Sequence, residues 1–163
     1  MLPVEMNVEA AGQRYRQTQS FTYLGGVITE CRDVSTEIAR RSSACWMRIR
    51  RYQQERYDRP NVPLNFKIPM VKEVEALLYG YVTWTTRQEN CRKLRTVHHR
   101  VLLRIIGARQ HRSDHRVLSY NRALELTGCD SIEATLRARR LLWAGALTRM
   151  DDGRLHKRVM SGE

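Results

Sequence analysis

The chain has 163 residues, of which 42% are hydrophobic and 28% charged, and its formal net charge at pH 7 is +12. This length favours one domain, or one domain with a small appendage, and the apolar content excludes a disordered chain. The sequence lacks a run of about 18 apolar residues, so we expect neither a membrane-spanning helix nor a membrane partner. The first ten residues do not resemble a signal peptide, and we therefore expect an intracellular protein, nuclear or cytoplasmic.

Arginine supplies 25 of the 29 basic residues, because only four are lysine. Guanidinium groups bind phosphates bidentately and stack on bases, so this composition favours a nucleic-acid partner. A GC-rich genome would also enrich arginine, and that alternative stays open. The charge is clustered: residues 34–59 carry a net +4 and residues 91–116 a net +7, whereas residues 1–33 carry −1.

Residues 1–33 are predicted to form strands. Val4, Met6 and Val8 alternate with polar residues, and residues 21–29 are rich in aromatic and β-branched side chains. Residues 10–13 can turn, and the Gly25–Gly26 pair predicts a bulge or a close backbone approach. We expect an antiparallel hairpin or a three-stranded meander.

The hydrophobic period changes to that of a helix at residue 33. Asp33 or Ser35 can cap a helix of about 20 residues, whose apolar arc and basic outer face are both evident. The apolar arc is Val34, Ile38, Cys45, Ile49 and Tyr52. Arg40 and Arg51 lie on the opposite side of the helix, with Arg48 and Arg50 flanking them.

Three further helical segments follow a linker at residues 59–63. Residues 64–86 have helical spacing, although Pro69 should start or kink that helix and Gly80 weakens it. Residues 88–107 give the clearest pattern, with Arg92, Arg95 and His99 opposite the apolar face and Gly107 as a C-cap. A short helix should run from about residue 118 to 128, and a long one should begin at Ser131 and end at residues 151–153. The predicted fold class is therefore mostly α, with a small N-terminal antiparallel β element followed by a helical bundle.

Few residues suggest catalysis or metal binding. The four cysteines form no C-x-x-C pair, so they are predicted to be free thiols in a reducing compartment. His111 and His115 are four apart, but they belong to a basic segment that favours a solvated loop. Asp151 and Asp152 follow a helix end, which disfavours a two-metal site. We therefore expect no catalytic residue, metal or cofactor in this chain.

Four short motifs are distributed over most of the chain. They are Phe21–Gly25 (FTYLG), Leu77–Gly80 with Thr83–Trp84 (LLYG and TW), Val97–Gly107, and Ser131–Arg140 with Trp143–Gly145 and Arg149–Met150. The series resembles the region that follows the catalytic palm in reverse transcriptases of non-LTR (LINE-type) retrotransposons. The resemblance implies a C-terminal fragment of the polymerase, with the end of the palm over residues 1–33 and a thumb-like helical bundle with C-terminal helices over residues 34–163.

The same resemblance implies roles for particular residues. Tyr23, Leu24 and Gly25 would be primer-grip-like. The helix that begins near residue 34 would follow a template–primer duplex with Arg40, Arg41, Arg48 and Arg51. In that family the catalytic Asp-Asp motif lies upstream of the segment matched by Phe21–Gly25, so Mg²⁺ is expected only on an upstream palm. The implied partners are RNA and DNA and the upstream palm and fingers, within a ribonucleoprotein. Two alternatives remain, a catalytically dead structural or protein-interaction remnant and a part of an active RNA-directed DNA polymerase.

Overall fold

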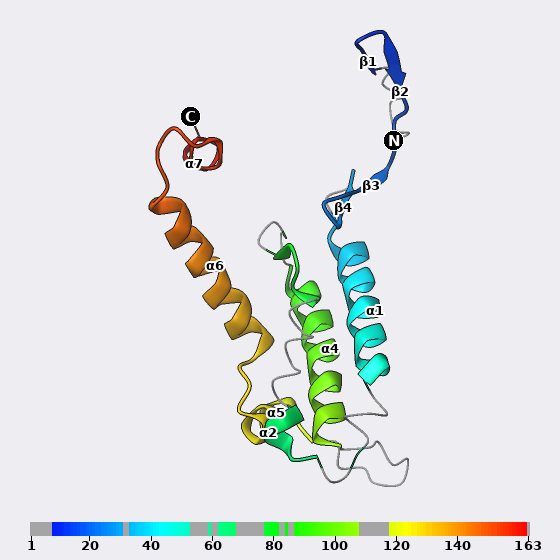
Figure 1. Ribbon diagram of the computed structural model, residues 1–163, viewed down its shortest axis with the longest axis vertical. Helices are drawn as coiled ribbons and strands as arrows, with labels where there is room; N and C mark the ends of the chain where they lie inside the picture. Colours follow the sequence, from blue (N-terminus) through cyan, green and yellow to red (C-terminus); the bar gives the residue numbers. More distant parts are fainter. Residues whose placement is uncertain are drawn as a thin grey trace.

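The described part of the chain has two N-terminal β-hairpins followed by helices, which confirms the predicted fold class. Figure 1 shows α1 (Ser35–Tyr52) and α4 (Gln88–Ile106) side by side, with α6 (Ile132–Thr148) diverging from them toward α7 (Leu155–Ser161). The computed structural model describes residues 8–30, 33–52, 59, 62–67, 77–81, 84, 87–107 and 118–162. Val4, Met6, Pro69, His111 and His115 lie outside these ranges.

The strands form two separate antiparallel pairs. The first joins β1 (Val8–Ala10) to β2 (Gln13–Tyr15), and the second joins β3 (Ser20–Tyr23) to β4 (Gly26–Thr29). The predicted turn at residues 10–13 is confirmed. Within residues 8–30 the hairpin alternative is therefore correct and the three-stranded meander is wrong.

Each hairpin closes through two residues with positive φ, as type I′ turns require. They are Ala11 (φ 52°) with Gly12 (φ 74°), and Leu24 (φ 46°) with Gly25 (φ 77°). The prediction of a bulge or close approach at Gly25 was wrong, because this glycine turns the chain. A Cβ on Gly25 would meet other atoms only at 3.9 Å, so its φ angle rather than crowding explains the glycine.

The core lies between α1 and α4. Ile38, Cys45 and Ile49 of α1 are buried with apolar residues of α4 in one cluster. The α4 members are Leu94, Val101 and Ile105. These are the periodic positions that the sequence predicted, so the basic faces of both helices turn away from the shared seam.

The helix predicted over residues 64–86 does not run without interruption. Its described parts are a single turn, α2 (Leu64–Lys67), and a short turn that ends near Tyr81. Gly80 has φ 73°, which lies outside the range of a right-handed α-helix, so a helix cannot continue through this residue. Leu77, Leu78 and Trp84 are nevertheless buried in the core.

Capping defines the C-terminal helices, with Ser131 at the predicted start of α6, although α6 ends at Thr148 rather than at the predicted residues 151–153. The hydroxyl of Ser119 accepts from Arg122 N–H to begin α5 (Tyr120–Thr127), and Ser131 accepts from Ala134 N–H to begin α6. Gly107 and Gly128 end α4 and α5 in the left-handed conformation. α7 was not predicted.

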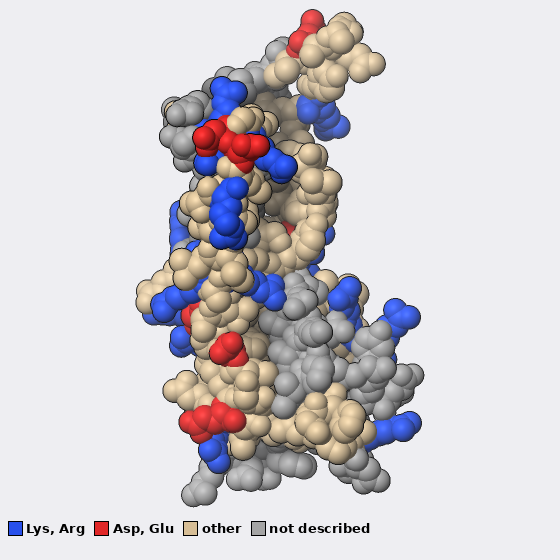
Figure 2. Space-filling model, turned by 60° about the vertical axis from the view of Figure 1, so that its left-hand side comes forward, with Lys and Arg blue, Asp and Glu red and all other residues tan. Residues whose placement is uncertain are grey.

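Basic side chains are dispersed over the face that carries α6 and α7, with acidic groups between them (Figure 2). In the described ranges no helix is long and apolar enough to cross a membrane. Nor do the described His, Cys, Asp and Glu residues form a group that could hold a metal ion.

Candidate nucleic-acid interface

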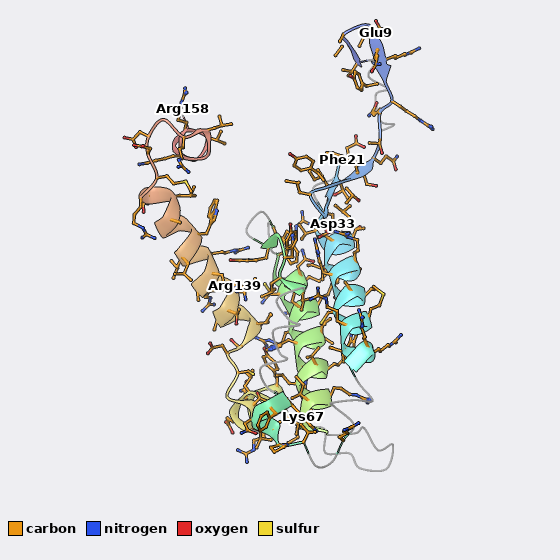
Figure 3. The ribbon with its side chains drawn as sticks, viewed as in Figure 1. Glu9, Phe21, Asp33, Lys67, Arg139 and Arg158 are labelled. Carbon is orange, nitrogen blue, oxygen red and sulfur yellow. The ribbon has the colours of Figure 1, made fainter. Side chains whose placement is uncertain are left out.

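The turn that joins β3 to β4 presents the three residues predicted to be primer-grip-like. Tyr23 and Leu24 are exposed, at 61% and 76% of their full accessible areas, and Gly25 follows them. The turn lies above the N-terminus of α1, which Asp33 begins by accepting from the N–H and hydroxyl of Ser35 (Figure 3). The turn therefore lies at the exposed tip of a short hairpin.

A buried carboxylate of α1 fastens this hairpin to the helix. Only 4% of the Glu37 side chain is exposed, and it accepts from Val27 N–H of β4 at 3.0 Å. It also accepts from Nε of Arg40 at 3.1 Å and from Nε of Arg41 at 2.7 Å. Burial raises the pKa of Glu37, but these hydrogen bonds outweigh it and the net pKa is lowered. Glu37 is therefore ionised at neutral pH.

The two arginines continue from Glu37 to the turn itself. The Nη2 atoms of Arg40 and Arg41 both donate to the carbonyl of Gly25. The Arg41 guanidinium also lies 4.5 Å from the centre of the Tyr79 ring, and the Tyr79 hydroxyl donates to the Leu24 carbonyl at 3.2 Å. Arg40 and Arg41, predicted to contact nucleic acid, thus hold the turn in place.

A pocket of about 600 Å³ opens beside this turn. Most of its lining is apolar or aromatic, and it is bounded by the hairpin, the start of α1 and the segment around Trp84. The aromatic and aliphatic lining residues are Tyr23, Leu24, Val27, Ile28, Val34, Tyr79 and Trp84. The exposed turn is therefore the rim of a concave surface.

The last two turns of α1 carry the remaining predicted arginines of this helix. Arg48 and Arg51 are both exposed, as is Arg50 beside them. Met47, also exposed, lies between Arg40 and Arg51 on the outer side of the helix. This end of α1 presents basic groups to solvent, as its sequence pattern predicts.

The predicted basic residues of α4 separate into two groups. Arg92 is exposed, whereas Nε of Arg95 donates to Glu133 of α6 at 2.6 Å and its guanidinium lies over the Tyr120 ring. Nε2 of His99 donates to the carbonyl of Leu118 at 2.9 Å. Arg95 and His99 therefore connect α4 to α5 and α6, and Arg92 alone of the three has a wholly outward position.

A buried histidine completes the contact between α4 and α5. His98 is 3% exposed, and its Nδ1 lies 2.7 Å from the Tyr120 hydroxyl, which accepts from Ile132 N–H at 2.9 Å. Burial lowers the pKa of His98 to about 4, so the ring is neutral at pH 7. His98 therefore belongs to the buried face of α4.

Two outward basic residues of α4 were missed. Arg100 and Lys93 are exposed on the side of the helix that carries Arg92 and Thr96. Arg92, Thr96 and Arg100 follow one another at i, i+4 and i+8, a spacing that could have found Arg100 from the sequence. Lys93 pairs with Glu89 at 2.8 Å.

Comparison of the chain with protein-family models, with curated proteins and with solved structures returned no match. Its function is therefore inferred from its own residues and their geometry.

Proposed function

We propose that this chain binds the sugar–phosphate backbone of a nucleic-acid duplex through the outward arginines of α1 and α4. The observation that carries the proposal is the exposure of Arg48, Arg51, Arg92 and Arg100 on helices whose opposite faces form the rigid core. Arginines on packed helices keep a fixed spacing, which suits recognition of backbone shape without sequence readout.

The resemblance to reverse transcriptases supports a more specific form of this proposal. The duplex would be a template–primer, and the chain would act as a non-catalytic, thumb-like module beside an upstream palm that holds Mg²⁺. The exposed Tyr23 and Leu24 at the rim of the pocket suit a primer-grip-like role, because Glu37, Arg40 and Arg41 hold their turn rigidly.

Substitution of the outward arginines tests the proposal. Binding of a fluorescent RNA–DNA template–primer would be measured by anisotropy for the wild type and for the double variant Arg51→Ala with Arg92→Ala. Loss of two phosphate contacts should weaken binding by similar factors for several unrelated sequences and lower the salt slope by about 2.

A matched control removes an arginine that has an intramolecular partner. Arg122→Ala breaks an exposed pair with Glu125 on α5, 2.8 Å long, and should leave affinity unchanged. Equal affinity for the wild type and the double variant would contradict the assignment to these two helices.

A further inference from the structure

Helix α6 has apolar residues on two opposite faces. Ile132, Leu136 and Leu147 are buried on the inner face. The outer face follows the spacing i, i+4, i+7, i+8 and i+11, which places its residues on one stripe of the helix. That stripe consists of Ala134, Ala138, Leu141, Leu142 and Gly145.

Among the residues that the structure describes, none buries the outer stripe. Leu141 and Leu142 are 73% and 72% exposed, and Ala134 and Ala138 are exposed as well. Figure 1 places α6 at the edge of the molecule, away from α1. Two adjacent leucines at such exposure, in line with small residues, form an apolar surface that the described part of the chain leaves open.

The shape of this stripe suits another helix. Ala134 and Ala138 leave shallow positions beside the two leucines, whereas at Gly145 the Arg149 side chain lies 3.3 Å from where a Cβ would be. Small residues let a second helix approach closely, and the leucines can insert between its side chains.

The charge around the stripe selects the partner. Residues 137–158 contain seven basic and two acidic residues, and one of the acidic pair, Asp152, bonds Lys157 at 2.5 Å. The face that carries α6 shows basic groups along its length (Figure 2). A second copy of this chain would bring like charges together, whereas an acidic partner would be attracted.

We propose that the outer face of α6 docks an acidic amphipathic helix of a partner protein. Leucines or similar residues of that helix would cover Leu141 and Leu142, and its glutamates or aspartates would face the exposed Arg137 and Arg149 beside the stripe. This site is separate from the outward arginines of α1 and α4, so it stands independently of the nucleic-acid proposal.

A peptide of defined chemistry tests the site on the full chain. The probe is a fluorescent helical peptide of about 20 residues, with leucine at a and d positions and glutamate at the flanking positions. Its control has lysine in place of every glutamate. We expect the acidic peptide to bind and the basic one to bind at least about tenfold more weakly.

Variants of the stripe locate the binding. Leu141→Ser with Leu142→Ser should weaken binding of the acidic peptide at least about tenfold, because the two leucines that the bound peptide would bury are lost. The matched control, Leu155→Ser with Val159→Ser, removes exposed apolar groups of α7 and should bind as the wild type does. If the leucine variant fails to fold, Ala138→Trp fills the same surface without removing apolar area and should also weaken binding about tenfold.

Several results would overturn the proposal. Absence of binding by the acidic peptide, equal binding of both peptides, or wild-type affinity in the leucine and Ala138→Trp variants would each do so. A wild-type dimer that the leucine variant dissociates, seen by light scattering, would assign the face to a second copy. Binding to phosphatidylserine vesicles, or to the template–primer, that is lost only in the leucine variant would assign it to a lipid or nucleic acid.

Discussion

Several basic residues that the sequence marks as ligands for phosphate serve the fold. Arg40 and Arg41 join Glu37 to the carbonyl of Gly25, and Arg95 joins α4 to α6. A basic residue three or four positions after a buried carboxylate is as well placed for an intramolecular pair as for a ligand. The sequence pattern predicts which face such a residue occupies, but the strand or helix that it contacts is set by the tertiary fold.

The carboxylate of Glu37 should be essential for attaching the hairpin. Glu37→Gln removes the charge that three donors share, and we expect a loss of about 2 kcal/mol in the free energy of unfolding. Amide hydrogen exchange at Val27 should accelerate at the same time. Glu89→Gln breaks only the exposed pair with Lys93, which solvent screens, and should lower the free energy of unfolding far less in urea denaturation. Equal losses for the two variants would show that Glu37 has no special role.

The buried His98 should make the protein sensitive to acid. Its pKa is about 4 in the folded state and near 6.5 when unfolded, so the unfolded state binds the proton first as pH falls. Stability is therefore full above pH 6.5 and decreases between pH 6.5 and 4, by about 3 kcal/mol at most. His98→Asn should flatten this decrease in urea denaturation across that range, whereas Thr96→Ala on the same helix should retain it. A pH slope that survives in His98→Asn would contradict the assignment.

At the scale of elements, strict periodicity was the most informative property of the sequence. Both ends of α4 and the start of α1 were predicted within one or two residues, because each helix buries one continuous apolar face and these ends have clear signals. The segment 64–86 was predicted less well, since Gly80 adopts a left-handed conformation in the middle of an apolar pattern. α7 was missed because only Leu155 and Val159 suggest its period, and both are exposed.

The candidate site was predictable only in part. Helical spacing predicts the basic outer faces of α1 and α4, and Arg48, Arg51 and Arg92 are exposed as expected. The pocket beside the β3–β4 turn was not predictable, because Tyr79 and Trp84 reach it from more than 50 residues away. Pairing between distant segments leaves no local pattern in a single sequence.

The β3–β4 turn can be improved by one substitution. Leu24 adopts a left-handed conformation (φ 46°), which is unfavourable for leucine. Because the residue is 76% exposed, packing of its side chain offsets little of this cost. Leu24→Asn gives the Asn-Gly pair that type I′ turns favour and should raise the free energy of unfolding by about 1 kcal/mol. Gly25→Ala should lower it. A destabilised Leu24→Asn variant would mean that the leucine side chain contributes to the fold through the adjoining pocket.

At the scale of the whole molecule, a helical core carries two distinct surfaces. The outward arginines of α1 and α4 suit a polyanion, and the outer stripe of α6 suits a protein helix. Residues 1–33 carry a net −1 although the chain carries +12, so the positive charge lies after the hairpins, in residues 34–163. The field of this charge concentrates a polyanion near the helices before specific contacts form.

The salt dependence of binding tests the central claim most directly. The wild-type chain would be titrated with an RNA–DNA template–primer at several salt concentrations between about 50 and 200 mM, and log Kd plotted against log salt. Contacts by the four outward arginines predict a linear plot in which the association constant falls with a slope of about −3 to −4. Absence of binding at the lowest salt concentration, or an affinity that salt does not change, would contradict the proposed function.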